Sequence, residues 1–361
     1  MGIHYKNTIF LILLMASYQL FSQEVITKRI EKTFEMTNTG ELYLENKYGN
    51  VNIIGWNENN ISVTIDIKVS SKKKENAQDL FERIIPKFKT TDNFISIVSE
   101  INKKRTSFFS RYFNKVNPFE FDKSNIEINY TIYLPINAEI DISNKFGDII
   151  IDNWTGKLKA NIEHGDLWIN ESIGNANIDM KFGKLRAKSI TYGSISLKNG
   201  DINVENSQDL SLKTSGAKIE ISKVKELELI SSKDEITIEN VGSLGGIIKF
   251  STVQLDTVDK SIDLRMKVAY LKVLKINRSD AQVTIDQESS DININISNLS
   301  FKFKATLEEG LLRLPTSFSN IESNVIDKNK RIRKISASYG KSLIGELSFT
   351  GKKGVILLKE Q

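Results

Sequence analysis

The sequence offers few side chains for nucleophilic or metal-assisted catalysis. It has two histidines and no cysteine, and imidazole and thiolate groups supply most catalytic bases, nucleophiles and metal ligands. His4 lies in an N-terminal segment that we expect to be removed, so His164 is the one candidate left for a Ser-His-Asp triad. His164, however, takes the place that Phe146 and Phe182 hold in the neighbouring repeats. We interpret His164 as a structural residue, and we predict no catalytic residue, no metal ligand and no cofactor.

A row of acidic residues is the second candidate for chemistry. Asp148, Asp166, Lys184 and Asp201 occur at one position of successive repeats. Two neighbouring aspartates about 4.8 Å apart on stacked strands could share a proton or hold Ca²⁺, and glycoside hydrolysis needs two carboxylic acids. Lys184 interrupts this row, and a solvated ladder of charges explains the same residues. A carbohydrate-active enzyme with stacked carboxylates therefore stays an alternative to a non-enzymatic protein.

Segment 101–124, INKKRTSFFSRYFNKVNPFEFDKS, is a candidate binding site. It carries six Lys or Arg residues and six aromatic residues between two predicted strands, and an insertion of this length is unusual in a compact domain. It either protrudes and binds a protein, a glycan or a membrane surface, or folds back over the repeats. The residues that we predict to bind are Phe108, Phe109, Arg111, Tyr112 and Phe113.

Ile150 and Trp168 form a smaller candidate binding site. Both are expected at the outward centre of successive strands, where later repeats have Arg186, Asn203 and Glu220. Two adjacent apolar residues on an outer face indicate that something covers them. The cover is either a bound partner or the N-terminal part of the chain.

An internal repeat supplies the elements that position these residues. Apolar pairs two residues apart recur every 17 or 18 residues in a first series, and a second series lies between its members. This alternation is typical of strands. The first series is Ile149/Ile151, Leu167/Ile169, Leu185/Ala187, Ile202/Val204, Ile219/Ile221, Ile236/Ile238, Val253/Leu255 and Leu271/Val273. The second series is Leu158/Ala160, Ala176/Ile178, Ile195/Leu197, Leu210/Leu212, Leu227/Leu229 and Ile262/Leu264.

This period predicts the fold class. Each repeat contributes two short strands that cannot stand alone, and stacking the repeats buries a continuous core. Strands stacked at a fixed offset are parallel, and parallel crossovers are right-handed. We therefore predict an all-β chain with a right-handed parallel β-solenoid of 17–18 residues per rung. Its corners are expected at glycines, which allow a positive φ or a close backbone approach: Gly147, Gly165, Gly183, Gly200 and Gly216.

The N-terminal residues and the composition indicate export. A short apolar run, Ile9–Ala16, follows one basic residue, Lys6; it is too short to span a bilayer and is typical of a signal peptide. We place the cleavage after Ser22. The formal net charge of +5 is spread over a mixed surface, which does not favour nucleic acid as a partner. The expected location is the periplasm, the cell surface or the extracellular space.

Four parts follow from these patterns. One short helix is expected at Glu75–Ile85, ended by Pro86. The stretches before the repeats read as longer antiparallel strands, and those after them as closing strands with glycine turns. The parts are a signal peptide (1–22), an N-terminal antiparallel β module (23–135) with the insertion 101–124, the β-solenoid (136–305) and C-terminal capping strands (306–361).

The chain resembles the bacterial putative-adhesin family of secreted β-strand-repeat domains of unknown function. The resemblance rests on an early N-x-Y-G-x-V-x-I-x-x-W motif and on serial aromatic-glycine pairs. The motif residues are Asn46, Tyr48, Gly49, Val51, Ile53 and Trp56, and the pairs are Phe146-Gly147, His164-Gly165, Phe182-Gly183 and Tyr192-Gly193. After Gly216 the pattern gives way to SKDE (232–235) and FSTV (250–253).

The resemblance implies a β-solenoid and adhesion, without a set of binding residues. We therefore predict a non-enzymatic cell-envelope or cell-surface protein that binds or scaffolds. Its partner would be a protein or a glycan, with peripheral contact to the membrane or envelope. A periplasmic ligand-binding or envelope-sensing factor is the first alternative, and the carbohydrate-active enzyme is the second.

Overall fold

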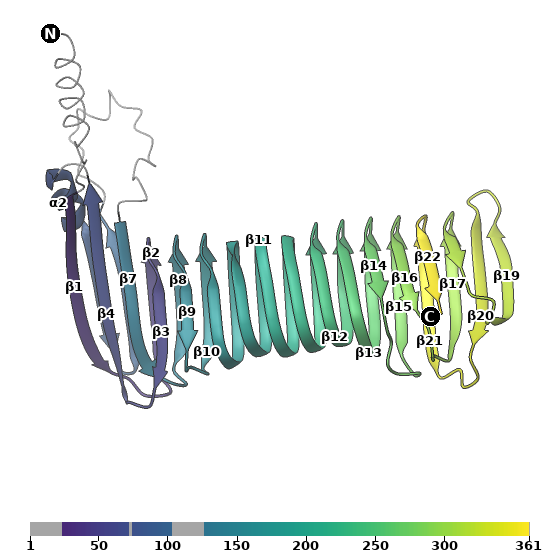
Figure 1. Cartoon of the computed structure of the whole chain (residues 1–361), viewed down its shortest axis with the longest axis horizontal. Helices are drawn as coiled ribbons and strands as arrows, with labels where there is room; N and C mark the ends of the chain where they lie inside the picture. The colour runs from purple at the N-terminus through teal and green to yellow at the C-terminus, as the bar shows by residue number, and fades with distance from the viewer. Residues whose placement is uncertain (1–23, 72–73, 103–125, 361) are drawn as a thin grey trace, which may run out of the picture.

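The computed structural model describes residues 24–71, 74–102 and 126–360. These residues form an elongated molecule whose strands follow one another along its long axis, with a helix at the N-terminal end (Figure 1). The all-β prediction is confirmed. The expected signal peptide and the five predicted binding residues of segment 101–124 lie outside the described residues. No helix in the described ranges is long and apolar enough to cross a membrane.

The N-terminal strands have both parallel and antiparallel neighbours. They are β1 (Glu24–Glu35), β2 (Glu41–Lys47), β3 (Val51–Trp56), β4 (Asn60–Ser71), β5 (Ile84–Thr91), β6 (Phe94–Ile101) and β7 (Ile126–Pro135). β1 pairs antiparallel with β4, β4 with β7, and β5 with β6. β2 pairs in parallel with β6, and β3 with β7. The expected antiparallel module is therefore antiparallel only in part, and the sheet is mixed.

The helix is shorter than the sequence predicts. α2 spans Lys74–Glu82, whereas Ile84 already begins β5 and Pro86 lies inside that strand, opposite Ser99. Among the described strands β5 pairs with β6 alone, so it is an edge strand, and an edge tolerates the missing N–H of proline. Pro86 is therefore a strand residue and does not mark the end of the helix.

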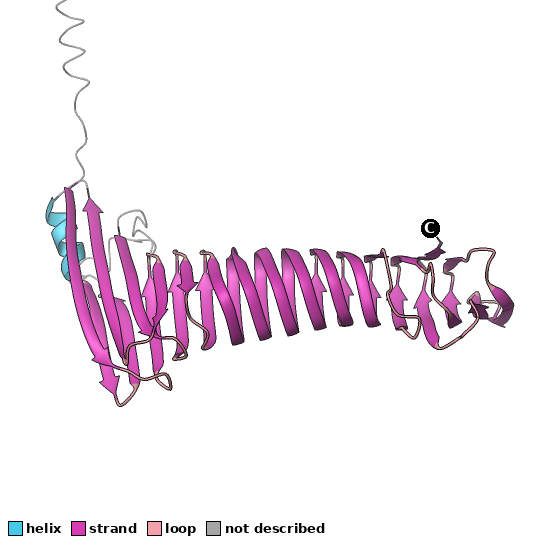
Figure 2. Cartoon of the chain, turned by 60° about the horizontal axis from the view of Figure 1, so that its bottom comes forward, coloured by secondary structure: helices cyan, strands magenta, loops and turns pink. Residues whose placement is uncertain are grey.

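The central strands pair in parallel at the predicted offset. They are β8 (Glu139–Lys145), β9 (Ile149–Asp152), β10 (Lys157–Glu163), β11 (Leu167–Ser232), β12 (Glu235–Lys249), β13 (Thr252–Lys267) and β14 (Tyr270–Val273). Leu167 lies opposite Ile149, and Ile236 lies opposite both Ile219 and Val253. β11 continues as one strand through corners at Phe182, Asn199 and Gly216, so one label covers several passes of the chain (Figure 1). Figure 2 shows these passes as continuous strand ribbon. We call residues 139–273 the repeat ladder.

Two layers of strands enclose the core of the repeat ladder. The first layer holds β3, β9 and the first series of apolar pairs, and the second layer holds β2, β8, β10 and the second series. Inward residues of both layers, such as Leu167 and Ile178, are buried, while their neighbours in sequence face outward. The alternation read from the sequence therefore gives the correct inward and outward faces.

Each pass from the second layer to the first turns through a residue with positive φ. The φ angles lie between 50° and 67° at Tyr48, Phe146, His164, Phe182, Asn199, Gly216, Lys233, Phe250 and Val268. We call these residues the corner row. Backbone hydrogen bonds join its members to the next pass, for example from His164 N to Lys181 O and from Phe250 N to Lys267 O.

The corner glycines allow the close backbone approach that the sequence predicts. At Gly147, Gly165, Gly183 and Gly200 the preceding residue takes the positive φ. A Cβ on Gly165 would lie 2.0 Å from the carbonyl oxygen of Gly147, and one on Gly183 would lie 1.9 Å from that of Gly165. Gly216, by contrast, belongs to the corner row itself (φ 67°). The corner also persists at Lys233 and Phe250, where the aromatic-glycine motif ends, because the backbone and not the side chain defines it.

A buried carboxylate follows the corner at Lys233. Asp234 is 5% exposed and takes the position that glycine holds in earlier repeats. It accepts hydrogen bonds from the Thr214 hydroxyl (2.7 Å), the Ser231 hydroxyl (2.7 Å) and the Ala217 N–H (2.8 Å). These donors satisfy a charge that would otherwise be costly to bury.

The last strands of the chain lie between two earlier passes. The strands after the repeat ladder are β15 (Gln282–Glu288), β16 (Asp291–Asn295), β17 (Phe301–Glu308), β18 (Leu311–Arg313), β19 (Ser319–Asp327), β20 (Ile332–Tyr339), β21 (Gly345–Lys352) and β22 (Val355–Lys359). β21 pairs in parallel with β15 on one side and β17 on the other, and β22 lies between β16 and β18 in the same way (Figure 1). β20 and then β19 close this end in antiparallel pairing.

Candidate binding groove

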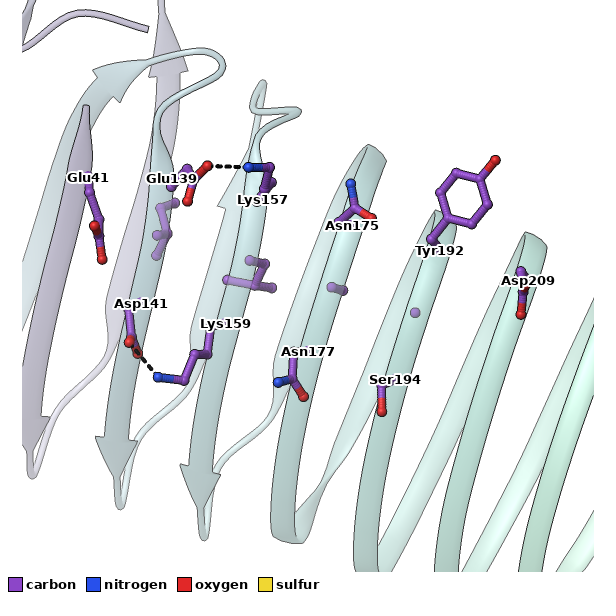
Figure 3. Close-up of a pocket in the computed structure, with 14 residues that line it drawn as sticks. Glu41, Glu139, Asp141, Lys157, Lys159, Asn175, Asn177, Tyr192, Ser194 and Asp209 are labelled. Atoms are coloured by element: carbon purple, nitrogen blue, oxygen red, sulfur yellow. Dashed lines mark hydrogen bonds and ion pairs between the residues drawn. The ribbon is translucent and has the colours of Figure 1, made fainter. Parts of the chain in front are cut away.

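Outward side chains of the second layer stack into rows. Matching positions on neighbouring parallel strands lie about 4.8 Å apart, so similar rows run along the whole repeat ladder. One row holds Glu41, Glu139, Lys157, Asn175, Tyr192 and Asp209, and the next holds Asp141, Lys159, Asn177 and Ser194 (Figure 3). The hollow that these side chains line has a volume of about 600 Å³. We call it the second-layer groove.

Ion pairs occupy the N-terminal half of the groove. Lys157 Nζ lies 2.5 Å from a Glu139 carboxylate oxygen, and Lys159 Nζ lies 2.7 Å from Asp141. The hydrogen bond from Lys159 to Asp141, together with the charge of that carboxylate, raises the pKa of Lys159. All four side chains remain in contact with solvent, so the pairs contribute little to stability. Their effect is to hold these side chains against one another as one wall.

The C-terminal half of the groove has polar groups that are not engaged. Tyr192 is 49% exposed. The side chains of Asn175, Asn177, Ser194 and Asp209 are exposed as well. Within the described ranges none of these five makes a side-chain hydrogen bond or ion pair. This half therefore offers two amides, a hydroxyl, a carboxylate and a phenol ring to a ligand.

The floor of the groove consists of residues whose side chains face the core. Leu158, Ala176 and Gly193 lie there, so a ligand would meet mainly strand backbone between the two rows. Gly193 is required at its place, since a Cβ would lie 2.9 Å from both Ile190 Cγ2 and Leu210 Cδ1. The core side chains thus fill the space under Gly193.

The charges of the groove restrict its ligands. Four carboxylates face two ammonium groups among its lining residues, which disfavours an anionic ligand. No group of three or more His, Asp or Glu side chains in the described part of the chain is arranged to hold a metal ion. The free groups instead suit a neutral or cationic ligand with many hydroxyls, whose C–H faces can pack on the Tyr192 ring.

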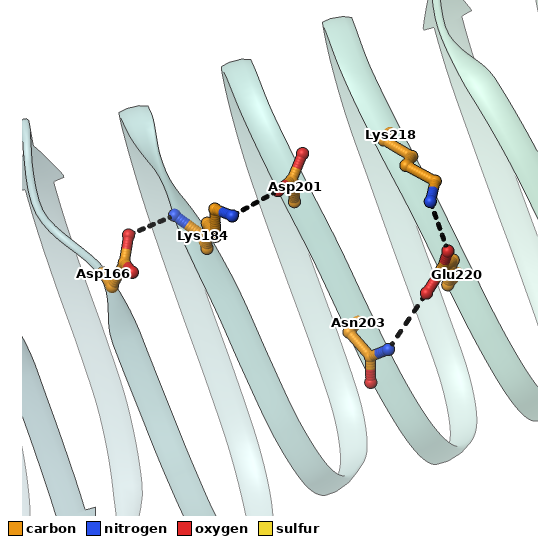
Figure 4. A network of polar contacts seen from close by, with 6 residues as sticks. All are labelled: Asp166, Lys184, Asp201, Asn203, Lys218 and Glu220. Carbon is orange, nitrogen blue, oxygen red and sulfur yellow. Dashed lines mark hydrogen bonds and ion pairs between the residues drawn. The ribbon is translucent and has the colours of Figure 1, made fainter.

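The predicted acidic row holds the backbone of neighbouring passes. Asp148 Oδ1 accepts a hydrogen bond from the Asp166 N–H (2.9 Å), and Asp166 Oδ1 accepts one from the Lys184 N–H (2.8 Å). Lys184 Nζ in turn pairs with Asp201 at 3.1 Å, as Figure 4 shows. The Asn50 side chain accepts the N–H of Asp148 in the same manner. These carboxylates therefore join successive passes of the chain through hydrogen bonds and an ion pair.

His164 lies in the corner row between two phenylalanine rings. Its ring centroid is 5.1 Å from that of Phe146 and 4.8 Å from that of Phe182, with planes within 6° of parallel. Tyr48 stacks on the other side of Phe146 at 5.5 Å. This four-ring stack agrees with the interpretation of His164 as a structural residue.

Ile150 and Trp168 lie side by side on the first layer. They are opposite each other in the parallel register, and both are half-buried. The Arg186 guanidinium lies over the Trp168 ring at 4.7 Å, a cation–π contact. The N-terminal strand β3 continues the layer beside Ile150, through Asn52. Part of the expected cover is thus a side chain of the next pass.

A small hollow lies on the passes that follow Trp168, beginning at the strand that carries Arg186. Its volume is about 110 Å³. Lys218 pairs with Glu220 at 2.7 Å, and the Asn203 amide donates to the same carboxylate at 3.3 Å (Figure 4). Its lining residues are Lys184, Leu185, Arg186, Asp201, Ile202, Asn203, Lys218 and Glu220. The binding role of Ile150 and Trp168 stays a prediction.

The sequence held a signal for the groove that the motif search missed. Tyr192-Gly193 matches the aromatic-glycine corner motif, yet the neighbouring corners lie at Phe182 and Asn199. Tyr192 is instead an outward strand residue. The second series pairs Ala176 with Ile195, which would align Asn175 with Ser194. The corners at Phe182 and Asn199 are 17 residues apart and instead place Asn175 and Tyr192 in one row.

No family model and no curated protein matches the chain. Several solved structures are similar at low identity. A putative adhesin from Parabacteroides merdae is 12% identical, with a TM-score of 0.37, over 74% of this chain and 91% of the other. A putative lipid binding protein from Parabacteroides distasonis is 9% identical (TM-score 0.30; 92% and 97% covered), and a putative cell adhesion protein from Clostridium sporogenes is 13% identical (TM-score 0.19; 93% and 100% covered). Similarities at these TM-scores do not decide function.

Proposed function

We propose that this chain is a non-enzymatic, adhesin-like binding or scaffolding protein of the bacterial cell envelope or cell surface. Its signal peptide, residues 1–22, would direct export. The observation that carries the binding role is the second-layer groove, where unengaged amide, hydroxyl, carboxylate and phenol groups from successive strands converge on one hollow. Pockets with a few convergent polar groups beside an aromatic ring are the usual form of a binding site.

The architecture that we propose for this role is a right-handed parallel β-solenoid over residues 136–305. The parallel registers at offsets of 17 and 18 residues support it, as does the right-handed rule for parallel crossovers. The module 23–135 and the capping strands 306–361 would flank it. Such a rod holds its outward rows in fixed register, which suits the recognition of an extended ligand.

The ligand class that we propose is a neutral or amino-sugar glycan. Asn175, Asn177 and Ser194 would exchange hydrogen bonds with its hydroxyls, and Tyr192 would pack on a sugar ring. Asp209 would favour a cationic amine over an anionic group. Because the rows repeat along the ladder, an extended chain could bind across several strands at once.

The engaged state of the acidic row favours binding over catalysis. Asp148 and Asp166 each accept a backbone hydrogen bond from the next pass, and a carboxylate held in this way is a poor general acid. An enzyme built on the acidic row would lose turnover in Asp148→Ala with Asp166→Ala. On our proposal the same double variant loses stability and keeps glycan affinity in the remaining folded protein.

Glycan affinities of groove variants test whether the second-layer groove is the binding site. We expect Tyr192→Ala and Asn177→Ala each to weaken binding about tenfold, since side chains at the centre of a site dominate its affinity. The measurement is titration calorimetry with ligands found on a glycan array. Tyr270→Ala is the matched control, because Tyr270 is an exposed tyrosine on the first layer (38% exposed). Equal losses in the control and the groove variants would refute the groove as the site.

A second binding site at Ile150 and Trp168 is part of the same proposal, and so are Phe108, Phe109, Arg111, Tyr112 and Phe113 of the insertion. Replacing Trp168 with Ala should lower affinity for a partner that the groove variants still bind. Serine replacements at Phe108, Phe109 and Phe113 should do the same while the fold survives. Unfolding of these serine variants would show that the insertion is part of the core.

The cellular location needs its own experiment. An antibody or a protease added to intact cells would reach the protein if it is displayed at the surface, and we expect labelling there. Labelling only after permeabilisation would contradict surface adhesion and favour the periplasmic alternative. The groove experiment does not depend on this result.

A further inference from the structure

The corner row changes character along the molecule. Its first four rings stack on one another, but further along it exposes single apolar side chains. Phe250 is 51% exposed and Val268 is 49% exposed. Close by on the second layer, Ile230 is 43% exposed and lies opposite Ile247. These side chains are apolar and are left uncovered by the described part of the chain.

Cationic side chains surround these apolar ones. Lys213, Lys233, Lys249 and Arg265 are all exposed. Their side chains form no ion pair within the described ranges. Arg265 lies opposite Ile247 on the neighbouring parallel strand. We call these residues together the corner patch: Lys213, Ile230, Lys233, Ile247, Lys249, Phe250, Arg265 and Val268.

The carboxylates near the corner patch are few, and the nearest ones already form ion pairs or hydrogen bonds. Glu288 is paired with Lys267 at 2.8 Å, and Glu308 is paired with Lys352 at 2.8 Å. Asp286 lies opposite Arg265 on the neighbouring strand and accepts a hydrogen bond from the Thr350 hydroxyl at 2.8 Å. Glu228 and Asp263 lie one outward position further from the corner. The patch itself therefore carries four cations and no carboxylate.

The backbone explains why the apolar residues protrude. Phe250 and Val268 have φ of 54° and 50°, a conformation that β-branched and bulky residues rarely adopt. It places each residue at the outer bend between the two layers, where the chain leaves one strand and enters the next. Hydrogen bonds from Lys233 N to Lys249 O and from Phe250 N to Lys267 O fix successive bends along one edge. The result is an edge on which apolar side chains lie among cations. Ile247, Lys249 and Arg265 also line a hollow of about 530 Å³ beside this edge.

We propose that the corner patch docks on the anionic surface of a lipid bilayer. Phe250, Val268 and Ile230 would enter the headgroup region, and the lysines would contact lipid phosphates. Apolar side chains among cations are the pattern by which proteins lie on membrane surfaces, and exposed Lys and Arg are attracted to anionic lipids. A protein partner would need a broad complementary area, whereas a fluid bilayer adapts to a narrow, uneven edge.

This contact is separate from the second-layer groove. The groove ends at Asp209, and the corner patch begins four residues later on the same pass, at Lys213, and extends to later passes. The molecule could therefore lie on a membrane by this edge while the groove remains accessible. Failure of glycan binding would leave the membrane proposal standing, and the reverse also holds.

The test is sedimentation of the full mature chain with vesicles. Vesicles of phosphatidylcholine mixed with phosphatidylglycerol should bind the protein, and pure phosphatidylcholine vesicles should bind it weakly. We expect Phe250→Asn with Val268→Asn to weaken binding about tenfold. Asparagine already occupies the corner row at Asn199 (φ 55°), so the backbone should tolerate it. Lys233→Gln with Lys249→Gln should also weaken binding about tenfold.

A matched charge control lies on the opposite edge. Lys223 and Lys225 are exposed beside the buried Val224, and Lys223→Gln with Lys225→Gln removes the same net charge. This control should bind anionic vesicles as the unmodified chain does. No binding to anionic vesicles, equal loss in the control, or unchanged binding of the Phe250/Val268 variant would each overturn the proposal. The last result would indicate that charge alone attracts the chain to any polyanion.

Discussion

Asp234 is the charged side chain that the repeat ladder encloses most completely by hydrogen bonds. Its carboxylate accepts from two hydroxyls and from the N–H groups of Ala217 and Ser232. Ser251 extends the network by accepting the N–H of Asp234. Glycine holds the equivalent place in earlier repeats, so the sequence pattern alone gives no reason for a carboxylate here. The reason lies in the serines and the threonine of neighbouring passes.

We predict that Asp234→Ala lowers the free energy of unfolding by about 3 kcal/mol, because it leaves several buried donors without an acceptor. Asp234→Asn keeps one acceptor oxygen and should lower the free energy of unfolding by less. Urea denaturation followed by circular dichroism measures both. Asp209→Ala, at an exposed carboxylate of the groove, should change stability by less than about 0.5 kcal/mol. A similar loss at both positions would contradict the role given to the network.

Tyr130 gives the protein a predicted sensitivity to alkali. Burial raises the pKa of this 1% exposed side chain to about 12, although its hydrogen bond with Ser99 lowers it. In the unfolded chain a tyrosine titrates near pH 10. The folded protein therefore keeps its proton where the unfolded chain loses it. The contribution of the buried Tyr130 proton to the free energy of unfolding is complete below about pH 10 and disappears as the pH rises to about 12.

We expect the titration of Tyr130 to lower the free energy of unfolding by about 2–3 kcal/mol between pH 10 and pH 12. Other tyrosines and lysines titrate in the same range, so the comparison is with Tyr130→Phe. That variant should be less stable at neutral pH, and its stability should fall less steeply above pH 10. Parallel slopes for the two proteins in urea denaturation would disprove the assignment.

At the scale of the element, the corner is the feature on which each strand pair depends. It combines a residue at positive φ with a following glycine that a neighbouring carbonyl approaches closely. We predict that Gly183→Ala lowers the free energy of unfolding by about 2–4 kcal/mol, since its Cβ would lie 1.9 Å from the Gly165 oxygen. The midpoint of thermal unfolding should fall accordingly.

Gly174 is the matched control for this substitution. A Cβ there meets no heavy atom within 4 Å, and Gly174 has no positive φ. Gly174→Ala should leave the stability unchanged or raise it by about 0.5 kcal/mol through the unfolded chain. If Gly183→Ala were equally harmless, the close approach would not be what requires glycine.

Much of this element could be read from the sequence. The alternation of apolar residues gives the inward faces, and the constant spacing gives the strand offset. What the pattern cannot give is which of two adjacent residues bears the positive φ, because both Phe182 and Gly183 recur together. Nor does an aromatic-glycine pair by itself specify a corner, as Tyr192 and Gly193 show. The candidate groove was missed for that reason, although its residues stand at regular outward positions.

At the scale of the whole molecule, both ends use inserted strands. β2 and β3 lie between β6 and β7 on one side and β8 and β9 on the other. β21 and β22 lie between strands formed by residues 282–295 and residues 301–313. The alternation of these strands is the same as elsewhere in the repeat, so a sequence pattern cannot reveal their spatial order. That order comes from long-range pairing alone.

We predict that removal of residues 345–361 disorders the C-terminal end and spares the rest. β17 and β18 would lose their parallel partners, and β15 and β16 would become an exposed edge. Limited proteolysis should then cut between residues 296 and 344, whereas glycan binding at the groove should persist. A truncated chain that resists protease like the full chain would show that the inserted strands are dispensable.

The inserted strands also separate the order of synthesis from the order of assembly. A ribosome delivers β2 and β3 before their neighbours β6 to β9, so they can accept partners on either side as these emerge. At the other end β17 to β20 leave the ribosome before β21, which lies between β15 and β17, and before β22, which lies between β16 and β18. The C-terminal strands therefore cannot complete their pairing until β21 and β22 have emerged, and non-local pairing of this kind is slow.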